Sequence, residues 1–116
     1  MLVTWAWLAL AVAAVVPAGA MYYDGNQLVA LTREYEKCDR EPKGCDFIRV
    51  GVFTGFVTGV SDSRESDYCP AAHIPVHQVC TIVVKYLSDH AEEWNMPAHV
   101  LVMRALKQAF PCEKAK

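Results

Sequence analysis

Four side chains that bind metals or act as nucleophiles lie close together near the middle of the chain. They are Cys69, His73, His77 and Cys80. Two cysteines and two histidines within twelve residues could fill a tetrahedral zinc site. The spacing C-x3-H-x3-H-x2-C matches no common zinc module, however, and Pro75 restricts helix between the two histidines. We therefore predict no metal and no cofactor here, and interpret both histidines as surface or boundary residues.

A catalytic pair is the second chemistry to consider. His77 and Cys80 are three residues apart, and a cysteine beside a histidine can be activated as a nucleophile. Cys80 falls on the apolar face of the helix expected after Pro75, where a free cysteine behaves as a small apolar residue. We predict no catalytic residues.

The most polar segment of the chain, residues 61–68, contains Asp62, Arg64, Glu65 and Asp67. Its carboxylates could hold calcium, but a cation in their midst and the lack of a calcium-loop pattern favour a solvated turn. Tyr68 closes the segment as an aromatic contact residue, and we interpret the whole as a candidate binding loop.

A second candidate segment joins the last two expected helices. It places Glu93 and the apolar residues Trp94 and Met96 in a polar connection. Such residues either cover the core or anchor a partner. We favour the cover for Trp94 and keep the connection as the weaker candidate for partner binding.

These segments must be positioned by a single small domain. The chain has 116 residues and a net charge of −2, without the basic cluster that nucleic-acid binding needs. Residues 1–20 resemble a cleaved signal peptide, with an apolar run and Ala18-Gly19-Ala20 before the cleavage point. We expect a mature domain at 21–116 with no membrane segment. Because no Lys or Arg precedes the apolar run, an uncleaved anchor stays the alternative.

Apolar periodicity predicts an all-α fold, a small disulfide-stapled bundle of four helices. The first helix is capped by Asp24 or Asn26 and stops near Cys38, and the third begins at Pro75. The expected inner faces are Leu28, Leu31, Tyr35 and Cys38 in the first helix, Val76, Val79, Cys80, Val83, Tyr86 and Leu87 in the third, and Ala98, Leu101, Val102, Ala105, Leu106, Ala109 and Phe110 in the fourth.

The second helix, from about residue 45 to 60, is apolar nearly all round and carries Gly51, Gly55 and Gly59 at every fourth position. Such a helix is normally central, and the glycine stripe predicts close approach of a neighbouring helix. A fully buried strand is the alternative, because periodicity cannot separate the two here.

Alternation of the helices up and down predicts two disulfides. The end of the first helix and the start of the second bring Cys38 near Cys45, and the ends of the second and fourth bring Cys69 near Cys112. Cys80 is left free. A disulfide framework is typical of an exported chain of this size.

The order of landmarks then resembles the Rap/Tai family of small exported immunity proteins. The landmarks are Cys38, Cys45, Gly59-Val60 with Asp62, Cys69 next to Pro70, Gln78-Val79, Val83 to Leu87, His90, Pro97-Ala98, Ala105-Leu106 and Phe110-Pro111-Cys112. The resemblance implies an all-helical, periplasmic and usually dimeric protein that binds a peptidoglycan amidase effector of a type VI secretion system and obstructs its active site. It implies no enzymatic activity.

A protein of another class stays the alternative: a general periplasmic stress protein of the acid-chaperone kind, with no dedicated enzyme partner. If a partner exists, the expected contact residues are Asp62, Arg64, Glu65, Asp67, Tyr68, Glu93 and Trp94.

Overall fold

A computed structural model describes residues 22–113 of the chain, in which the all-α prediction is confirmed. The helices are α1 (Gly25–Arg40), α2 (Phe47–Ser63), α3 (Val76–Asp89) and α4 (Ala98–Ala109), with short 3-10 helices η1 (Glu65–Asp67) and η2 (Ala91–Glu93). The expected signal peptide lies outside the described residues, as does its cleavage before Met21. Among the described helices, none has the length and apolar character needed to cross a bilayer.

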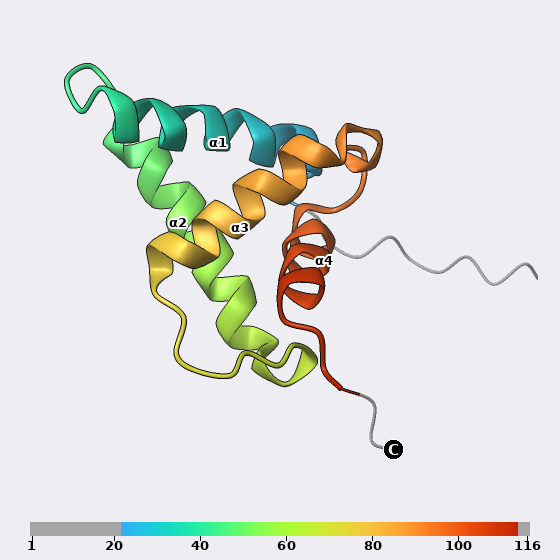
Figure 1. The fold of residues 1–116 in the computed structure, drawn as a ribbon. Coiled ribbons are helices and arrows are strands. Elements are labelled where there is room, and N and C mark those ends of the chain that lie inside the picture. The colour runs from blue at the N-terminus through green and yellow to red at the C-terminus, as the bar shows by residue number, and fades with distance from the viewer. Residues whose placement is uncertain (1–21, 114–116) are drawn as a thin grey trace, which may run out of the picture.

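The four helices cross one another obliquely around one core, in place of the alternating up-and-down arrangement that we predicted (Figure 1). α1 lies across one end of the molecule, and α2 and α4 lead away from it toward the end that carries the C-terminus. The largest fully buried side chains are Phe53, Leu28, Leu87, Leu101, Leu106, Val57, Val83, Val102 and Cys80. Since all four helices contribute to this set, each of them is held by the same core.

The start of α1 is tied to the connection before α4. Asp24 caps the helix: its carboxylate accepts the Gln27 amide at 2.9 Å, and the Gln27 side chain accepts the Asp24 amide at 3.0 Å. Gly25 N–H then donates to the Met96 carbonyl, and Asn26 N–H to the Trp94 carbonyl, both at 2.9 Å. The free amides of the first turn are therefore satisfied by a segment about 70 residues away.

The predicted packing of the glycine stripe is wrong. α2 is a helix, but Gly51, Gly55 and Gly59 are exposed, and a Cβ added at any of them would meet no neighbouring atom within 4 Å. Only Phe53, Val57 and Ser61 of this helix are fully buried. Because α2 is apolar on all sides, periodicity could not tell which side the core would cover.

Close approach occurs at another glycine. A Cβ at Gly25 would lie 2.6 Å from both the Trp94 carbonyl oxygen and Leu101 Cδ1.

Two predicted core positions are also wrong, because Val76 is 50% exposed and Ala109 is exposed at the end of α4. The remaining residues predicted on the inner faces of α3 and α4 are buried or half-buried.

Both predicted disulfides are present, and Cys80 is free and buried. The Cα atoms of Cys38 and Cys45 are 5.2 Å apart, and those of Cys69 and Cys112 are 4.9 Å apart.

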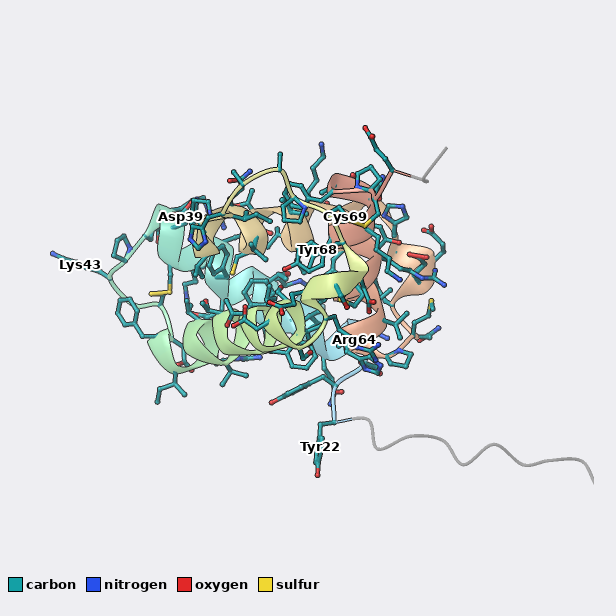
Figure 2. All side chains as sticks on the ribbon, turned by 90° about the horizontal axis from the view of Figure 1, so that it is seen from below. Tyr22, Asp39, Lys43, Arg64, Tyr68 and Cys69 are labelled. Carbon is teal, nitrogen blue, oxygen red and sulfur yellow. A yellow bond between two sulfur atoms is a disulfide. The ribbon has the colours of Figure 1, made fainter. Side chains whose placement is uncertain are left out.

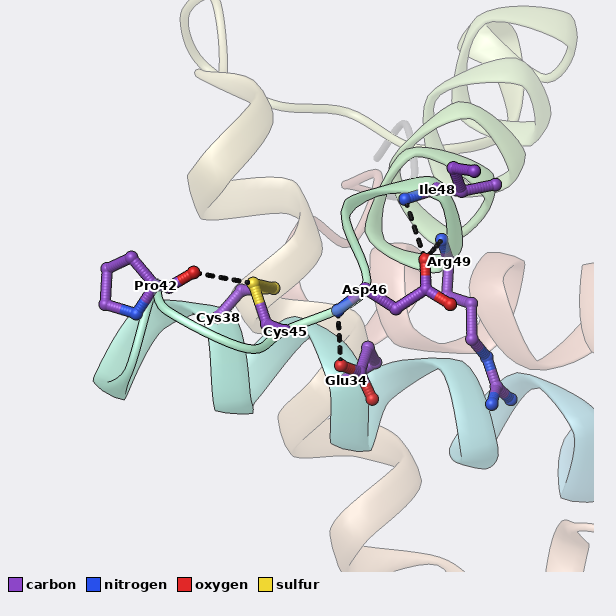
Figure 3. Close-up of a disulfide and its surroundings, with 7 residues drawn as sticks. All are labelled: Glu34, Cys38, Pro42, Cys45, Asp46, Ile48 and Arg49. Atoms are coloured by element: carbon purple, nitrogen blue, oxygen red, sulfur yellow. Dashed lines mark hydrogen bonds between the residues drawn. A yellow bond between two sulfur atoms is a disulfide. The ribbon is translucent and has the colours of Figure 1, made fainter.

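The first of these disulfides closes the turn between α1 and α2 (Figure 3). There the Asp46 amide donates to Glu34, and the Asp46 carboxylate caps α2 by accepting the amides of Ile48 and Arg49. The turn is thus held covalently by its disulfide and by the cap of the helix that follows.

Candidate partner-binding site

The acidic loop, residues 61–68, lies at the end of the molecule that also carries the C-terminus (Figures 1 and 2). α2 runs to Ser63, Arg64 ends it, and η1 turns the chain back. The Asp67 amide donates to the Arg64 carbonyl at 2.9 Å, which closes the turn. The loop is therefore a compact turn on a helix end, and not an extended segment.

The loop is anchored on its C-terminal side. Cys69 is bonded to Cys112, and its amide donates to the Phe110 carbonyl at 2.9 Å. The Tyr68 hydroxyl donates to the Ser61 carbonyl at 3.3 Å, and its ring lies 6.5 Å from that of Phe110. Tyr68 is consequently half-buried, so only part of its ring is available for the contact role that the sequence suggested.

The charged residues of the loop divide into two groups. Arg64 and Asp67 form an exposed ion pair at 3.5 Å. Asp62 and Glu65 have neither an ion pair nor a side-chain hydrogen bond to any residue that the structure describes. Burial first, and then the charges of these two carboxylates, raise the pKa of the Tyr68 hydroxyl. Both unpaired carboxylates are thus close enough to Tyr68 to influence its hydroxyl.

Beside Tyr68 lies a groove of about 420 Å³ between the end of α2 and the start of α3. Its lining residues are Thr58, Ser61, Asp62, Glu65, Tyr68, Pro70, Ala72, His73, Ile74, Val76 and Val79. The groove combines apolar walls with two carboxylates and has no lysine or arginine in its lining. Sequence reasoning missed its α3 side, because the oblique crossing of α2 and α3 could not be read from either helix alone.

In the second candidate segment, Glu93 and Trp94 make their contacts within the fold. The Trp94 indole N–H donates to the Leu87 carbonyl at 2.8 Å, and the ring packs against the core, as expected for a cover. Glu93 accepts from the Tyr86 hydroxyl at 2.7 Å and forms an ion pair with Arg104. Neither side chain is free to meet a partner without breaking a contact within the chain.

The contacts of Tyr86 and Glu93 shift the pKa values of both side chains. Burial and the neighbouring Glu93 carboxylate raise the pKa of Tyr86 to about 12. The hydrogen bond from Tyr86 and the charge of Arg104 lower the pKa of Glu93. The Arg104 partner was not predicted, since it is eleven residues from Glu93 in sequence and one helix away. Tyr86 also stacks on His90, with ring centroids 4.0 Å apart.

The four residues considered for zinc do not converge. Cys69 is in a disulfide, and Cys80 is fully buried, with burial raising the pKa of its thiol. His77 is exposed, and its Nδ1 lies 2.8 Å from the Tyr35 hydroxyl, so its hydrogen-bond partner is a tyrosine in α1. His73 is exposed and lines the groove. Within residues 22–113 there is no group of three or more metal-binding side chains.

Comparison with known proteins agrees with the fold and the cysteine framework. Residues 24–112 match the family of Rap1a immunity proteins. This range contains all four helices and both disulfides. No curated protein matches the chain. With most of its length inside the family match, this chain belongs to the Rap1a immunity protein family.

Proposed function

We propose that this chain is an exported, non-enzymatic immunity protein that binds a peptidoglycan amidase effector of a type VI secretion system in the periplasm and obstructs its active site. Membership of the immunity family supports binding of an effector. Two disulfides in a chain of this size support an oxidising compartment.

The observation that carries the proposal is the acidic loop. It protrudes at one end of a compact helical body, and the Cys69–Cys112 disulfide holds it there, so little conformational entropy is lost when it docks. Asp62, Arg64, Glu65 and Asp67 supply the polar contacts. Glu93 and Trp94 are engaged in contacts within the fold and are not part of this loop.

The test is protection. A candidate amidase effector of a type VI secretion system is exported to the periplasm of a sensitive bacterial host, with and without the chain, and survival is measured. Wild type is expected to protect, and the double variant R64A/E65A is expected to weaken both protection and amidase binding. The control is R40A, which breaks another exposed ion pair, with Glu36 at 3.9 Å. Arg40 is the last residue of α1, beside the turn that leads into α2, whereas the acidic loop follows the other end of α2. Equal protection by both variants would show that the loop is not the contact.

Tyr68 needs a conservative change. Because its ring packs on Phe110 and against the core, truncation to alanine would disturb the fold as well as the surface. Tyr68→Phe keeps that packing and removes only the hydroxyl bond to Ser61.

The same experiment separates the alternative class. A general acid-stress chaperone would protect unrelated periplasmic proteins from acid-induced aggregation and would leave the amidase active. Absence of amidase inhibition together with such protection would replace the present proposal.

We further propose that the chain is a homodimer that pairs through the outer face of α2. This face exposes Ile48 by 80% and Val52 by 37%, beside the glycine stripe with nothing packed on it. Between Phe47 and Ser61 the helix has a single charged residue, Arg49. A second copy of the same helix could approach the stripe closely and cover the apolar side chains.

Sedimentation of the purified chain tests the dimer. Ile48→Glu is expected to give a monomer, since it replaces the most exposed apolar side chain of this face by a charged one. Gln108→Glu adds the same charge to the exposed side of α4 and is expected to leave the dimer intact. A monomeric wild type, or a dimer that survives Ile48→Glu, would refute this interface.

A further inference from the structure

The groove beside the acidic loop has a mixed apolar and acidic lining. Membership of the immunity family does not by itself imply this lining. The lining includes the apolar residues Ile74, before α3, and Val79, in α3, together with the acidic residues Asp62 and Glu65. Asp62 is on the last turn of α2 and Glu65 begins η1, so the two carboxylates are three residues apart on neighbouring turns.

Both carboxylates lack a compensating cation. Arg64, the nearest basic residue in sequence, pairs with Asp67 at 3.5 Å and does not line the groove. The other described ion pairs, Arg40 with Glu36 and Arg104 with Glu93, belong to other helices. The groove therefore presents two carboxylates beside an apolar surface with no lysine or arginine in its lining, and His73 is its one basic side chain.

We propose that this groove receives an arginine side chain of the partner protein, an assignment that rests on the proposed effector binding. The aliphatic part of an arginine packs on apolar surface while its guanidinium stays at the polar edge. The guanidinium carries five N–H donors in a planar fork, so it can serve two carboxylates at once, whereas a lysine ammonium is a compact point charge.

The volume agrees with this occupant. About 420 Å³ is more than one side chain of this size needs, so the groove admits the arginine together with adjoining backbone of the partner. The Tyr68 ring also lines the groove, and the Cys69–Cys112 disulfide and Phe110 hold it in place. The site is thus formed before the partner arrives.

The first experiment needs no effector. Nα-acetyl-arginine methylamide is titrated into the isotopically labelled chain, and amide chemical shifts are followed by NMR. Saturable shifts are expected at Tyr68, Ile74 and Val79. The matched neutral probe, the citrulline derivative, has nearly the same shape without the charge and is expected to bind about tenfold more weakly.

Variants then test the two carboxylates. The double variant D62N/E65Q keeps the shape of both side chains and is expected to weaken binding of the arginine probe roughly threefold to tenfold, the range for partly exposed charge pairs. Glu92→Gln is the control, because Glu92 is exposed, forms none of the described ion pairs and does not line the groove. Equal binding of the citrulline probe, tighter binding of the lysine analogue, or no loss in D62N/E65Q would overturn the assignment.

The second experiment uses the purified amidase and keeps the two proposals apart. If wild type binds the amidase and D62N/E65Q binds equally well, the groove assignment is wrong and the proposed function stands. If wild type does not bind the amidase, the proposed function is wrong, whatever the arginine probe shows. Both proposals are supported if wild type binds the amidase tightly and D62N/E65Q binds it at least threefold more weakly. The affinity of the double variant should also depend less on salt concentration than that of wild type.

Discussion

Replacing Gly25 by alanine tests whether the start of α1 is the tightest point of the fold. The new Cβ would lie 2.6 Å from the Trp94 carbonyl oxygen and 2.7 Å from the Trp94 Cα. Both are backbone atoms, so no side-chain rotation relieves the overlap and the 94–97 segment must move. That movement stretches the bonds from Gly25 to Met96 and from Asn26 to Trp94, each 2.9 Å long.

The cost follows from these contacts. Overpacking of a tight site costs about 1–3 kcal/mol, and weakening of two backbone hydrogen bonds adds roughly 1 kcal/mol. We expect a loss of about 3 kcal/mol, which for a domain of this size lowers Tm by on the order of 15 °C. The assay is thermal and urea unfolding followed by circular dichroism.

The control is Gly55→Ala, measured at a protein concentration where the chain is monomeric. No atom lies within 4 Å of the added Cβ, and alanine is the better helix former by about 1 kcal/mol. This variant is therefore expected to be slightly more stable than wild type. If Gly25→Ala changed Tm by no more than a degree or two, the close approach of α1 to the 94–97 segment would be refuted.

Four further outcomes follow from particular contacts. Replacing both Cys69 and Cys112 by alanine should cost about 4 kcal/mol in urea unfolding, because that disulfide closes the longer loop. Trp94→Phe should cost about 1 kcal/mol by removing the indole hydrogen bond while keeping most of the packing, and no loss would argue against that bond. Glu93 has a pKa below its ordinary 4.5, so its contribution to stability is present above that pH and is lost as the pH falls through the lower, folded value. Tm measured against pH should therefore fall less steeply in Glu93→Gln below pH 4.5. Tyr86 has a pKa raised from 10.0 to about 12, so its contribution is present below pH 10.0 and is lost as the pH rises toward 12, a loss that Tyr86→Phe should lack.

Much of the fold was predictable because the signals that specify it are local. Asp24 is followed three residues later by Gln27, which is the pattern of a capping box, and the helix begins there. The disulfide pairing was predicted from alternation of the helices, and the same helix ends meet although the helices cross obliquely. The oblique crossing of the helices did not matter for either result.

The wrong predictions have one physical cause. A contact between segments that are distant in sequence produces no local pattern in the sequence. Gly51, Gly55 and Gly59 have the spacing of a packed stripe but lie exposed, while the crowded glycine is Gly25, whose neighbours are Trp94 and Leu101. Spacing shows only that a close approach is possible. Which glycine is approached depends on how the helices cross.

The candidate site shows the same division between local and distant information. Composition located the acidic loop, because a run of charged residues between two apolar helices must be exposed. It could not show that Asp62 and Glu65 are left unpaired while Arg64 is taken by Asp67. The choice among neighbouring carboxylates depends on how η1 turns the chain.

The Cys69–Cys112 disulfide links the stability of the bundle to the shape of the site. It joins the end of the acidic loop to the end of α4, and the Cys69 amide bonds to Phe110, the residue on which Tyr68 packs. Reduction would therefore release Tyr68 from its support and loosen the wall of the groove, in addition to destabilising the fold. A chain whose binding surface depends on a disulfide in this way would acquire its full affinity only after oxidation, as the proposed binding in the periplasm requires.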